Sequence, residues 1–213
     1  MIKEIIFDLD GTLWDSTESV FLAWNKAVTS ELKDQNISIN KNDIRFEMEK
    51  KTADSFSSLL SSLDKEKASR LIKVCEQNQS EKIKKVPGKL YPGVVETLPI
   101  LSKSFKLYIA SNCQKGCIET FLSHYNFRDF FKGWICFGDT LLEKGENIKQ
   151  LIDKFSIKNA VYVGDTMNDY SSCQEAGIPM IAVLYGFGKF ENSVELFAKI
   201  KKFPELIEIL DKT

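Results

Sequence analysis

One short stretch decides the fold of this chain: residues 7–13 read Phe-Asp-Leu-Asp-Gly-Thr-Leu. The run at residues 2–6 just before it is rich in isoleucine and is typical of a buried strand. Asp8 and Asp10 are two positions apart, so an extended chain places both carboxylates on one face, and Gly11 lets the chain turn sharply after them. Two like charges at one strand end indicate a bound metal ion, although two solvated aspartates would give the same pattern.

Composition limits the kind of protein to which that strand belongs. The chain has 213 residues, 43% hydrophobic and 28% charged, which is typical of a soluble globular protein with one core domain and room for an insertion. A net charge of −1 argues against a nucleic-acid or membrane partner that is recruited by bulk charge. We expect a cytoplasmic protein with reduced cysteines, because the sequence shows neither a signal peptide nor a long apolar run.

Residues 16–86 predict only helices. Apolar side chains recur every three or four residues from Val20 to Leu32, and helical patterns continue at residues 44–50, 56–63 and 65–86. A purely helical block directly after the first strand indicates a cap domain at residues 16–86, inserted into a core domain formed by residues 1–15 and 87–213. The alternative is that these helices simply cover one face of the sheet. For a cap, Arg45 is the candidate for contacting the substrate.

After the Pro87-Gly88 pair, predicted strands and helices alternate along the chain. This alternation predicts an α/β fold, a Rossmann-like and mostly parallel sheet with helices on both faces. Ligands of such sheets bind beyond the carboxyl ends of the strands. The predicted strands lie at residues 105–110, 133–137, 160–163 and 180–184, and the helices at residues 94–101, 118–125, 144–155, 168–176 and 204–210.

Polar residues stand at several of these strand ends. Ser111-Asn112 follows the second strand and Asp165 follows the fourth, with Asp169 four positions further on, where a helix would turn it to the same side. Lys144 begins the helix after the third strand and can add a positive charge. Together with the two aspartates of the first strand, these carboxylates form an oxygen-rich pocket that suits Mg²⁺ better than Zn²⁺. The complete set is typical of a phosphoryl-transfer site.

Four motifs, in this order, resemble those of the haloacid dehalogenase superfamily, and within it the phosphoglycolate-phosphatase-like branch with a helical cap. Residues 8–13 are similar to the first motif, Asp-x-Asp-Gly-Thr-Leu, and Ser111 stands where the second motif has Ser or Thr. Lys144 corresponds to the lysine of the third motif, and residues 164–169 fit the fourth, Gly-Asp-x-x-x-Asp. The match covers the core, whereas the cap matches only in its position and helical character.

The resemblance implies Mg²⁺-dependent hydrolysis of a small phosphomonoester. Asp8 would attack phosphorus to form an aspartyl-phosphate, and Asp10 would act as general acid and then as general base. The ion would be held by Asp8, by the main-chain carbonyl of Asp10 and by Asp165, with Asp169 in a supporting position. The residues implied to bind the phosphate and stabilise its oxygens are Gly11, Thr12, Ser111, Asn112 and Lys144.

The third motif departs from the usual pattern of the family. It often reads Lys-Pro-x-Pro there, whereas this chain has Lys-Gly-Glu-Asn at residues 144–147. We therefore expect a less rigid loop, in which Glu146 competes for the charge of Lys144. Two other functions are compatible with the same motif residues. One is a phosphomutase on the same fold, and the other is a non-catalytic regulatory protein that binds a phosphate ligand. The expected partner is a small phosphorylated metabolite, with no nucleic acid or membrane, and the expected state is a monomer or homodimer.

Overall fold

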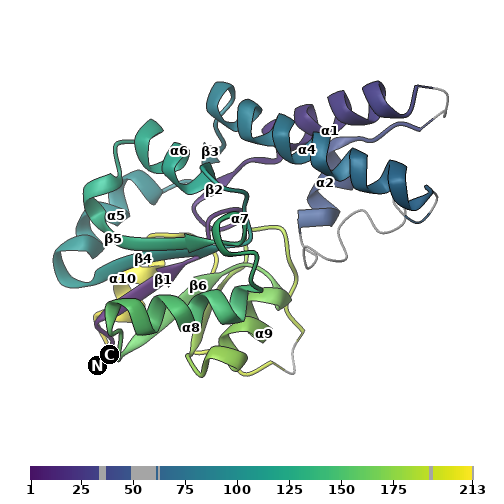
Figure 1. Ribbon diagram of the computed structural model, residues 1–213. Helices are drawn as coiled ribbons and strands as arrows, with labels where there is room; N and C mark the ends of the chain where they lie inside the picture. The colour runs from purple at the N-terminus through teal and green to yellow at the C-terminus, as the bar shows by residue number, and fades with distance from the viewer. Residues whose placement is uncertain (34–36, 49–60, 62, 192–193, 213) are drawn as a thin grey trace. The chain divides into compact units, whose positions relative to one another are not determined.

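The computed structural model describes residues 1–33, 37–48, 61, 63–191 and 194–212, and it falls into two compact units (Figure 1). The core unit comprises Met1–Asp15 and Lys89–Thr213, and the helical unit comprises Ser16–Gly88. The helix predicted at residues 56–63 lies almost entirely outside the described residues. Among the described residues, no helix is both long enough and apolar enough to cross a membrane.

The core unit is built on one parallel sheet of six strands, counted over the described residues. Its strand order is β5-β4-β1-β6-β7-β8, so β1, which carries the opening motif, is central and pairs with both β4 and β6. This confirms the predicted α/β fold with a parallel sheet. The strands are β1 (Glu4–Phe7), β4 (Lys106–Ser111), β5 (Phe131–Cys136), β6 (Ala160–Gly164), β7 (Met180–Val183) and β8 (Ala198–Ile200).

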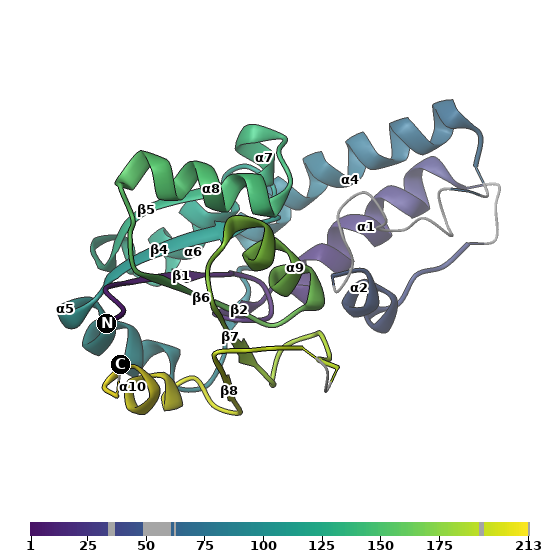
Figure 2. The same ribbon diagram turned by 90° about the horizontal axis from the view of Figure 1, so that it is seen from below.

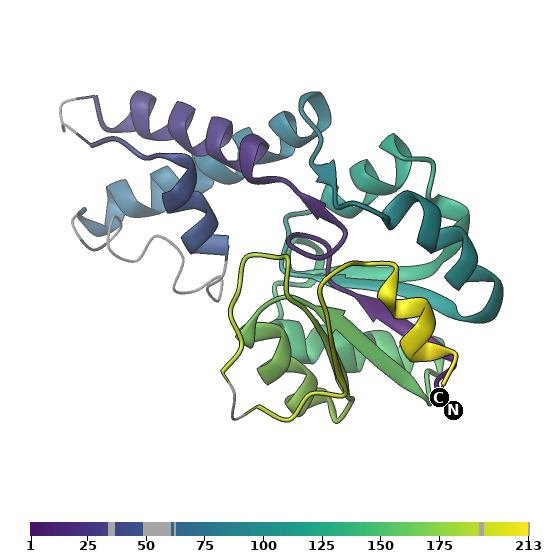
Figure 3. The same cartoon turned by 180° about the vertical axis from the view of Figure 1, so that it is seen from behind.

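Helices cover both faces of this sheet, because the strands are apolar on both sides. Figure 2 shows α8 on one face and α5 and α10 on the other. Figure 3 shows the two ends of the chain side by side at the margin of the core unit. The helices of the core unit are α5 (Val94–Ser104), α6 (Cys117–His124), α7 (Phe137–Thr140), α8 (Lys144–Phe155), α9 (Met167–Ala176) and α10 (Glu205–Leu210), with a 3₁₀ turn, η2 (Arg128–Phe130).

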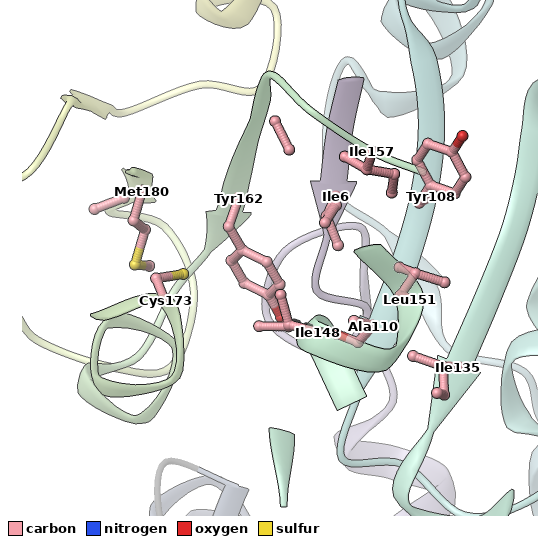
Figure 4. Close-up of a cluster of buried hydrophobic side chains, with 12 residues drawn as sticks. Ile6, Tyr108, Ala110, Ile135, Ile148, Leu151, Ile157, Tyr162, Cys173 and Met180 are labelled. Carbon is pink, nitrogen blue, oxygen red and sulfur yellow. Dashed lines mark hydrogen bonds between the residues drawn. The ribbon is translucent and has the colours of Figure 1, made fainter. Parts of the chain in front are cut away.

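Alternating side chains of β1 explain how the two layers are filled. Ile6 points toward α8, where Ile148 and Leu151 join it in one buried cluster (Figure 4). Phe7 points the other way, and its ring lies 5.9 Å from that of Phe203, just before α10. Each face of the central strand is therefore buried against a helical layer, which fixes the register of the sheet.

Two short pieces of sheet were not predicted from the sequence. β8 is the sixth strand, and its three residues are too few to show a periodic pattern. The other piece is an antiparallel pair formed by β2 (Trp14–Asp15) and β3 (Lys89–Leu90), in which Asp15 stands opposite Lys89. This pair lies where the chain leaves the core unit and returns to it, so two residues distant in sequence are direct neighbours.

The helical unit has a small core of its own. The helices among its described residues are α1 (Thr17–Glu31), α2 (Lys41–Met48) and α4 (Lys65–Lys85). One buried cluster joins Ala27, Val28 and Leu32 of the first helical segment to Leu71 and Cys75 of α4. The hydroxyl of Ser19 donates a hydrogen bond to the carbonyl of Val86, which ties the start of α1 to the end of α4.

Candidate active site

Neighbouring strands of the sheet bring the first and fourth motifs together. Phe7 stands opposite Val163 in the register of β1 and β6, and the N–H of Asp8 donates to the carbonyl of Val163 at 2.8 Å. Asp165 directly follows β6, so both aspartates leave the same edge of the sheet. This is the carboxyl edge at which parallel sheets bind ligands.

Lys144, the first residue of α8, joins two of these carboxylates. Its Nζ lies 2.9 Å from Oδ1 of Asp8 and 2.5 Å from Oδ1 of Asp169. All three side chains are nearly or completely buried, with exposed fractions of at most 6%. Charge-assisted hydrogen bonds in such a dry site are strong and directional, so Lys144 fixes Asp8 and Asp169 relative to each other.

Asp169 is held by its own helix terminus. Thr166 is the N-cap of α9, and its hydroxyl accepts from the N–H of Asp169 at 3.1 Å and donates to Oδ2 of Asp169 at 2.8 Å. Oδ2 also accepts from the N–H groups of Asp165 and Thr166, at 3.1 and 3.0 Å. This capping box saturates one oxygen of Asp169 with hydrogen bonds, so the residue mainly orients its neighbours.

Asp165 is enclosed by main-chain atoms of two loops. Its Oδ2 accepts from the N–H of Phe187 at 2.7 Å, and the hydroxyl of Thr12 lies 3.5 Å from its Oδ1. A Cβ on Gly11 or on Gly186 would collide with the Asp165 carboxylate. Both glycines are therefore required by close approach to this side chain, and Gly11 additionally has a φ of +85° that disfavours other residues.

The buried carboxylates carry more negative charge than the lysine can balance. Burial raises the pKa of Asp8 to about 7; the Lys144 charge opposes this shift and the Asp169 charge adds to it. Burial, together with the charges of Asp169 and Asp8, also raises the pKa of Asp165 well above its usual range. Burial by itself would lower the pKa of Lys144, but the charges of Asp169 and Asp8 outweigh it and raise that pKa, so the lysine stays charged.

A divalent cation would fit this excess of negative charge. Carboxylate oxygen atoms of Asp8, Asp165 and Asp169 all lie within 4.8 Å of one another. Among the described residues, this is the group of three or more His, Cys, Asp or Glu side chains that could hold a metal ion. An all-oxygen set is the donor chemistry of a hard ion such as Mg²⁺. The Asp10 carboxylate is outside this group and its residue is half-buried.

Comparison with known proteins identifies the family. The family model described as haloacid dehalogenase-like hydrolase matches residues 5–183. The chain belongs to this family. The matched region contains the aspartates, the lysine and the sheet edge described above.

Individual relatives agree with this assignment along nearly the whole chain. A phosphoglycolate phosphatase of Aquifex aeolicus is 28% identical and covers 99% of this chain and 97% of its own. A phosphoglycolate phosphatase of Vibrio vulnificus is 28% identical and covers 89% and 87%. Together with the family model, these matches confirm the prediction of a haloacid dehalogenase-like enzyme of the phosphatase type.

Solved structures show the same fold. A haloacid dehalogenase-like hydrolase of Streptococcus pneumoniae superposes with a TM-score of 0.84 at 24% identity, over 98% of both chains. CbbY of Rhodobacter sphaeroides, in complex with phosphate, has a TM-score of 0.80 at 17% identity, over 99% of this chain and 100% of its own. At these identities the likeness concerns the fold.

The remaining motif residues of this haloacid dehalogenase-like hydrolase lie at the same sheet edge or beside it. Ser111 ends β4, next to β1, and is 3% exposed, whereas Asn112 after it is half-buried. The Ser111 hydroxyl accepts a long hydrogen bond from the N–H of Cys113 at 3.4 Å, and among the described residues it makes no hydrogen bond to the carboxylates.

Arg45, the residue predicted to contact the substrate, is exposed on α2 of the helical unit.

The third motif contains a positioning residue that the sequence did not reveal. Glu146 is exposed and does not compete for Lys144, so that expectation is wrong. Asn147 is fully buried, and it is this residue that orders the loop. Its Oδ1 accepts from the Thr140 hydroxyl at 2.8 Å, and its Nδ2 donates to the Leu142 carbonyl at 3.0 Å. An amide between two loop positions thus substitutes for the missing prolines.

Tyr162 is a second residue without a motif signal. It lies in the middle of β6, fully buried, and its hydroxyl donates to the carbonyl of Ala110 at 2.8 Å. The same oxygen is 3.3 Å from Oδ1 of Asp169. A tyrosine at a strand position is typical of an ordinary hydrophobic core. Only the tertiary structure shows that Tyr162 supports Ala110, the residue before Ser111, and contacts Asp169.

Proposed function

We propose that this enzyme is a Mg²⁺-dependent phosphatase that hydrolyses a small phosphomonoester through an aspartyl-phosphate on Asp8. The observation that carries the proposal is the buried contact of Lys144 with both Asp8 and Asp169, next to Asp165. A lone strand aspartate would be solvated. Here the proposed nucleophile is instead buried and paired with a fixed cation, and two further buried carboxylates lie close enough to share a second cation.

The proposed ion site uses groups from two strands. Asp8, the main-chain carbonyl of Asp10 and Asp165 would hold Mg²⁺, with Asp169 supporting Asp165 and Lys144 through its hydrogen bonds. When bound, Mg²⁺ supplies positive charge that screens the anionic nucleophile from the anionic phosphate. Burial raises the pKa of both Asp8 and Asp165, so ionising these carboxylates is costly without a further positive charge. A cation bound beside them would favour their ionised forms, which supports the proposed ion site.

The chemistry needs one nucleophile and one proton carrier. The Asp8 carboxylate attacks phosphorus while Asp10, protonated, gives its proton to the leaving oxygen, which departs as an alcohol. Asp10 then takes a proton from water, and the resulting hydroxide attacks phosphorus and releases inorganic phosphate and free Asp8. Lys144, the Ser111 hydroxyl and main-chain N–H groups near Gly11, Thr12 and Asn112 stabilise the phosphoryl oxygens.

The substrate proposed for this enzyme is 2-phosphoglycolate or a compound of similar size. The support is that the relatives in Aquifex aeolicus and Vibrio vulnificus, which match most of the chain, are phosphoglycolate phosphatases. The helical unit interrupts the core directly after β2 and is the proposed cap that limits the size of the substrate. Small anionic phosphomonoesters are therefore expected to be turned over better than nucleotides.

Phosphate release tests this proposal directly. With Mg²⁺, the enzyme is expected to release phosphate from 2-phosphoglycolate and from p-nitrophenyl phosphate, and EDTA should abolish both activities. Asp8→Asn should reduce turnover to background. Asp10→Asn should lower turnover of 2-phosphoglycolate by roughly 10²–10⁴-fold, the usual contribution of a general acid or base. Metal-independent activity in wild type, or turnover by Asp8→Asn, would refute the mechanism.

The covalent step has a matched test in the same variants. p-Nitrophenolate leaves without a proton, so Asp10→Asn should still form the aspartyl-phosphate from p-nitrophenyl phosphate but hydrolyse it slowly. After an acid quench, that variant should carry a phosphoryl group that hydroxylamine removes, as expected of an acyl phosphate. The double variant Asp8→Asn with Asp10→Asn is the control and should carry none.

A further inference from the structure

The segment Tyr185–Gly188 after β7 has no part in the chemistry above, yet it contacts both halves of the site. The hydroxyl of Tyr185 donates to the carbonyl of Thr12 at 2.9 Å. Two residues later, the N–H of Phe187 donates to Oδ2 of Asp165 at 2.7 Å. Between them, a Cβ on Gly186 would collide with Asp165 and approach the Gly11 carbonyl to 2.5 Å. One short segment thus holds the loop after Asp8 and the aspartate after β6.

These contacts matter because the direct hydrogen bond from the loop of residues 10–13 to the Asp165 carboxylate is weak. The hydroxyl of Thr12 lies 3.5 Å from Oδ1 of Asp165, which is at the limit of a hydrogen bond. The Asp10 carbonyl and the Asp165 carboxylate belong to different loops, and both would have to converge on the same ion. Because Mg²⁺ demands near-ideal ligand geometry, a displacement between the loops would weaken its binding.

Tyr185 is itself held in place by a second tyrosine. Its ring lies 4.7 Å from that of Tyr91, at an interplanar angle of 46°. Leu13 directly follows Thr12, and its carbonyl accepts a hydrogen bond from the N–H of Tyr91 at 3.1 Å. Two consecutive carbonyls of the loop are thus fixed by two tyrosines that contact each other, so the Tyr185 hydroxyl approaches the loop from a supported position.

We propose that Tyr185 is a positioning residue of the Mg²⁺ site: its hydroxyl holds the loop of residues 10–13 in register with Asp165. The inference rests on the proposed function, because it assigns Tyr185 to the ion that Asp8, Asp10 and Asp165 would bind. The role assigned to Tyr185 is indirect, through the Thr12 carbonyl and its own segment.

Calorimetric titration of the intact enzyme with MgCl₂ tests the inference without relying on turnover. Tyr185→Phe keeps the ring against Tyr91 and removes only the hydroxyl. Loss of one hydrogen bond of ordinary strength should raise the Mg²⁺ dissociation constant by about 3- to 10-fold. Turnover of p-nitrophenyl phosphate should fall at low Mg²⁺ and recover at high Mg²⁺, with KM for the substrate unchanged.

Two further variants separate positioning from general stability. Tyr108→Phe removes a tyrosine hydroxyl from β4, where the ring packs on Phe155, and should leave the Mg²⁺ affinity unchanged. Tyr185→Leu also removes the ring contact with Tyr91 and should weaken Mg²⁺ binding more than Tyr185→Phe. Unchanged Mg²⁺ affinity in both Tyr185 variants, with normal binding in wild type, would overturn this inference alone. Absence of Mg²⁺ binding by wild type would overturn the proposed function together with it.

Discussion

Asp8 illustrates how burial at a single residue sets both reactivity and stability. A carboxylate at a strand end would normally be ionised at neutral pH, but here burial raises the pKa to about 7 in spite of the contact with Lys144. Without a metal, the folded state therefore favours the protonated acid more than the unfolded chain does, because the unfolded chain ionises near its ordinary pKa. The charge that makes Asp8 a nucleophile thus costs folding free energy when Lys144 is the cation that balances it and no metal ion adds to it.

This cost predicts a pH-dependent effect of Asp8→Asn. A raised pKa in the folded state means that the stability contributed by Asp8 is complete below about pH 4 and is lost as the pH rises through about 7. In EDTA, wild type should therefore lose more stability between pH 5 and pH 8 than Asp8→Asn. At pH 8 the variant should melt at a temperature higher by roughly 2–4 °C or more, as for about 1 kcal/mol in a chain of this size.

Added Mg²⁺ provides the control for that comparison. The ion should stabilise wild type at pH 8, which lies above the pKa of about 7 of Asp8, and it should affect Asp8→Asn much less. Thermal denaturation followed by circular dichroism measures both effects. Equal pH dependence of the two proteins in EDTA would contradict the assignment of the raised pKa to Asp8.

At the scale of an element, the loop between α7 and α8 shows one way to place a lysine without prolines. Thr140, Leu142 and Asn147 form a closed set of hydrogen bonds, since the N–H of Leu142 also donates to the Thr140 hydroxyl at 3.1 Å. The set is partly buried and spans the start of α8, where Lys144 lies. Fully satisfied polar networks of this kind rigidify the backbone that they span.

Asn147→Leu is therefore expected to loosen this loop. The substitution keeps the approximate volume but removes the acceptor of the shortest hydrogen bond of the Thr140 hydroxyl and the side-chain donor to the Leu142 carbonyl, at a cost of about 1–3 kcal/mol. Because Lys144 would lose its exact position, kcat/KM should fall by roughly 10-fold or more. Steady-state kinetics and thermal denaturation measure the two effects.

Glu146→Gln serves as the control for this variant. Glu146 lies on the same turn of α8, but its side chain is exposed. Neutralising it should change neither turnover nor stability measurably, because surface substitutions usually stay within about ±0.5 kcal/mol. A large effect of Glu146→Gln, or none of Asn147→Leu, would contradict the role given to the amide.

At the scale of the whole molecule, the chain leaves the core unit and returns to it through two paired strands. Trp14 stands opposite Leu90, and Asp15 stands opposite Lys89, in the antiparallel pair of β2 and β3. The helical unit has its own buried cluster of apolar side chains. Neighbouring entry and exit points and two separate cores are the features of an inserted domain that can be removed.

A core-only variant is expected to fold. Replacing residues 16–88 by Asn-Gly joins Asp15 to Lys89 through a two-residue turn, the connection favoured for directly opposed antiparallel residues. The variant should bind Mg²⁺ about as tightly as the intact chain and hydrolyse p-nitrophenyl phosphate. Its kcat/KM for 2-phosphoglycolate should fall by about 10-fold or more relative to p-nitrophenyl phosphate, because the substrate contacts proposed for the helical unit would be lost.

The linker itself needs a control, since a tight turn can be strained. A second variant with a six-residue glycine-serine linker at the same junction should fold and bind Mg²⁺ in the same way. Circular dichroism and calorimetry would show this. If both variants bound Mg²⁺ but retained full preference for 2-phosphoglycolate, the helical unit would not be the part that selects the substrate.

Much of the fold was visible in the sequence because it depends on local patterns. The apolar runs and the motif at residues 7–13 predicted a strand before Asp8 in a mostly parallel sheet, and the helix predicted at residues 144–155 coincides with α8. β8 was missed because its stability comes from pairing with β7, not from its own three residues. The residue types and spacing of Asp8, Asp165 and Asp169 predicted an anionic pocket.

What the tertiary structure decided is which side chains satisfy one another. Asn147, Tyr162 and Tyr185 carry no motif signal, since their partners are 5, 52 and 173 positions away. The same holds for the raised pKa of Asp8, which requires knowledge of what surrounds it. The sequence by itself thus determined five of the six strands described in the parallel sheet, and the residue types of the candidate site. Only the packing of distant segments determined the hydrogen bonds that position the site residues. The same packing determined the buried environment that raises the pKa of Asp8.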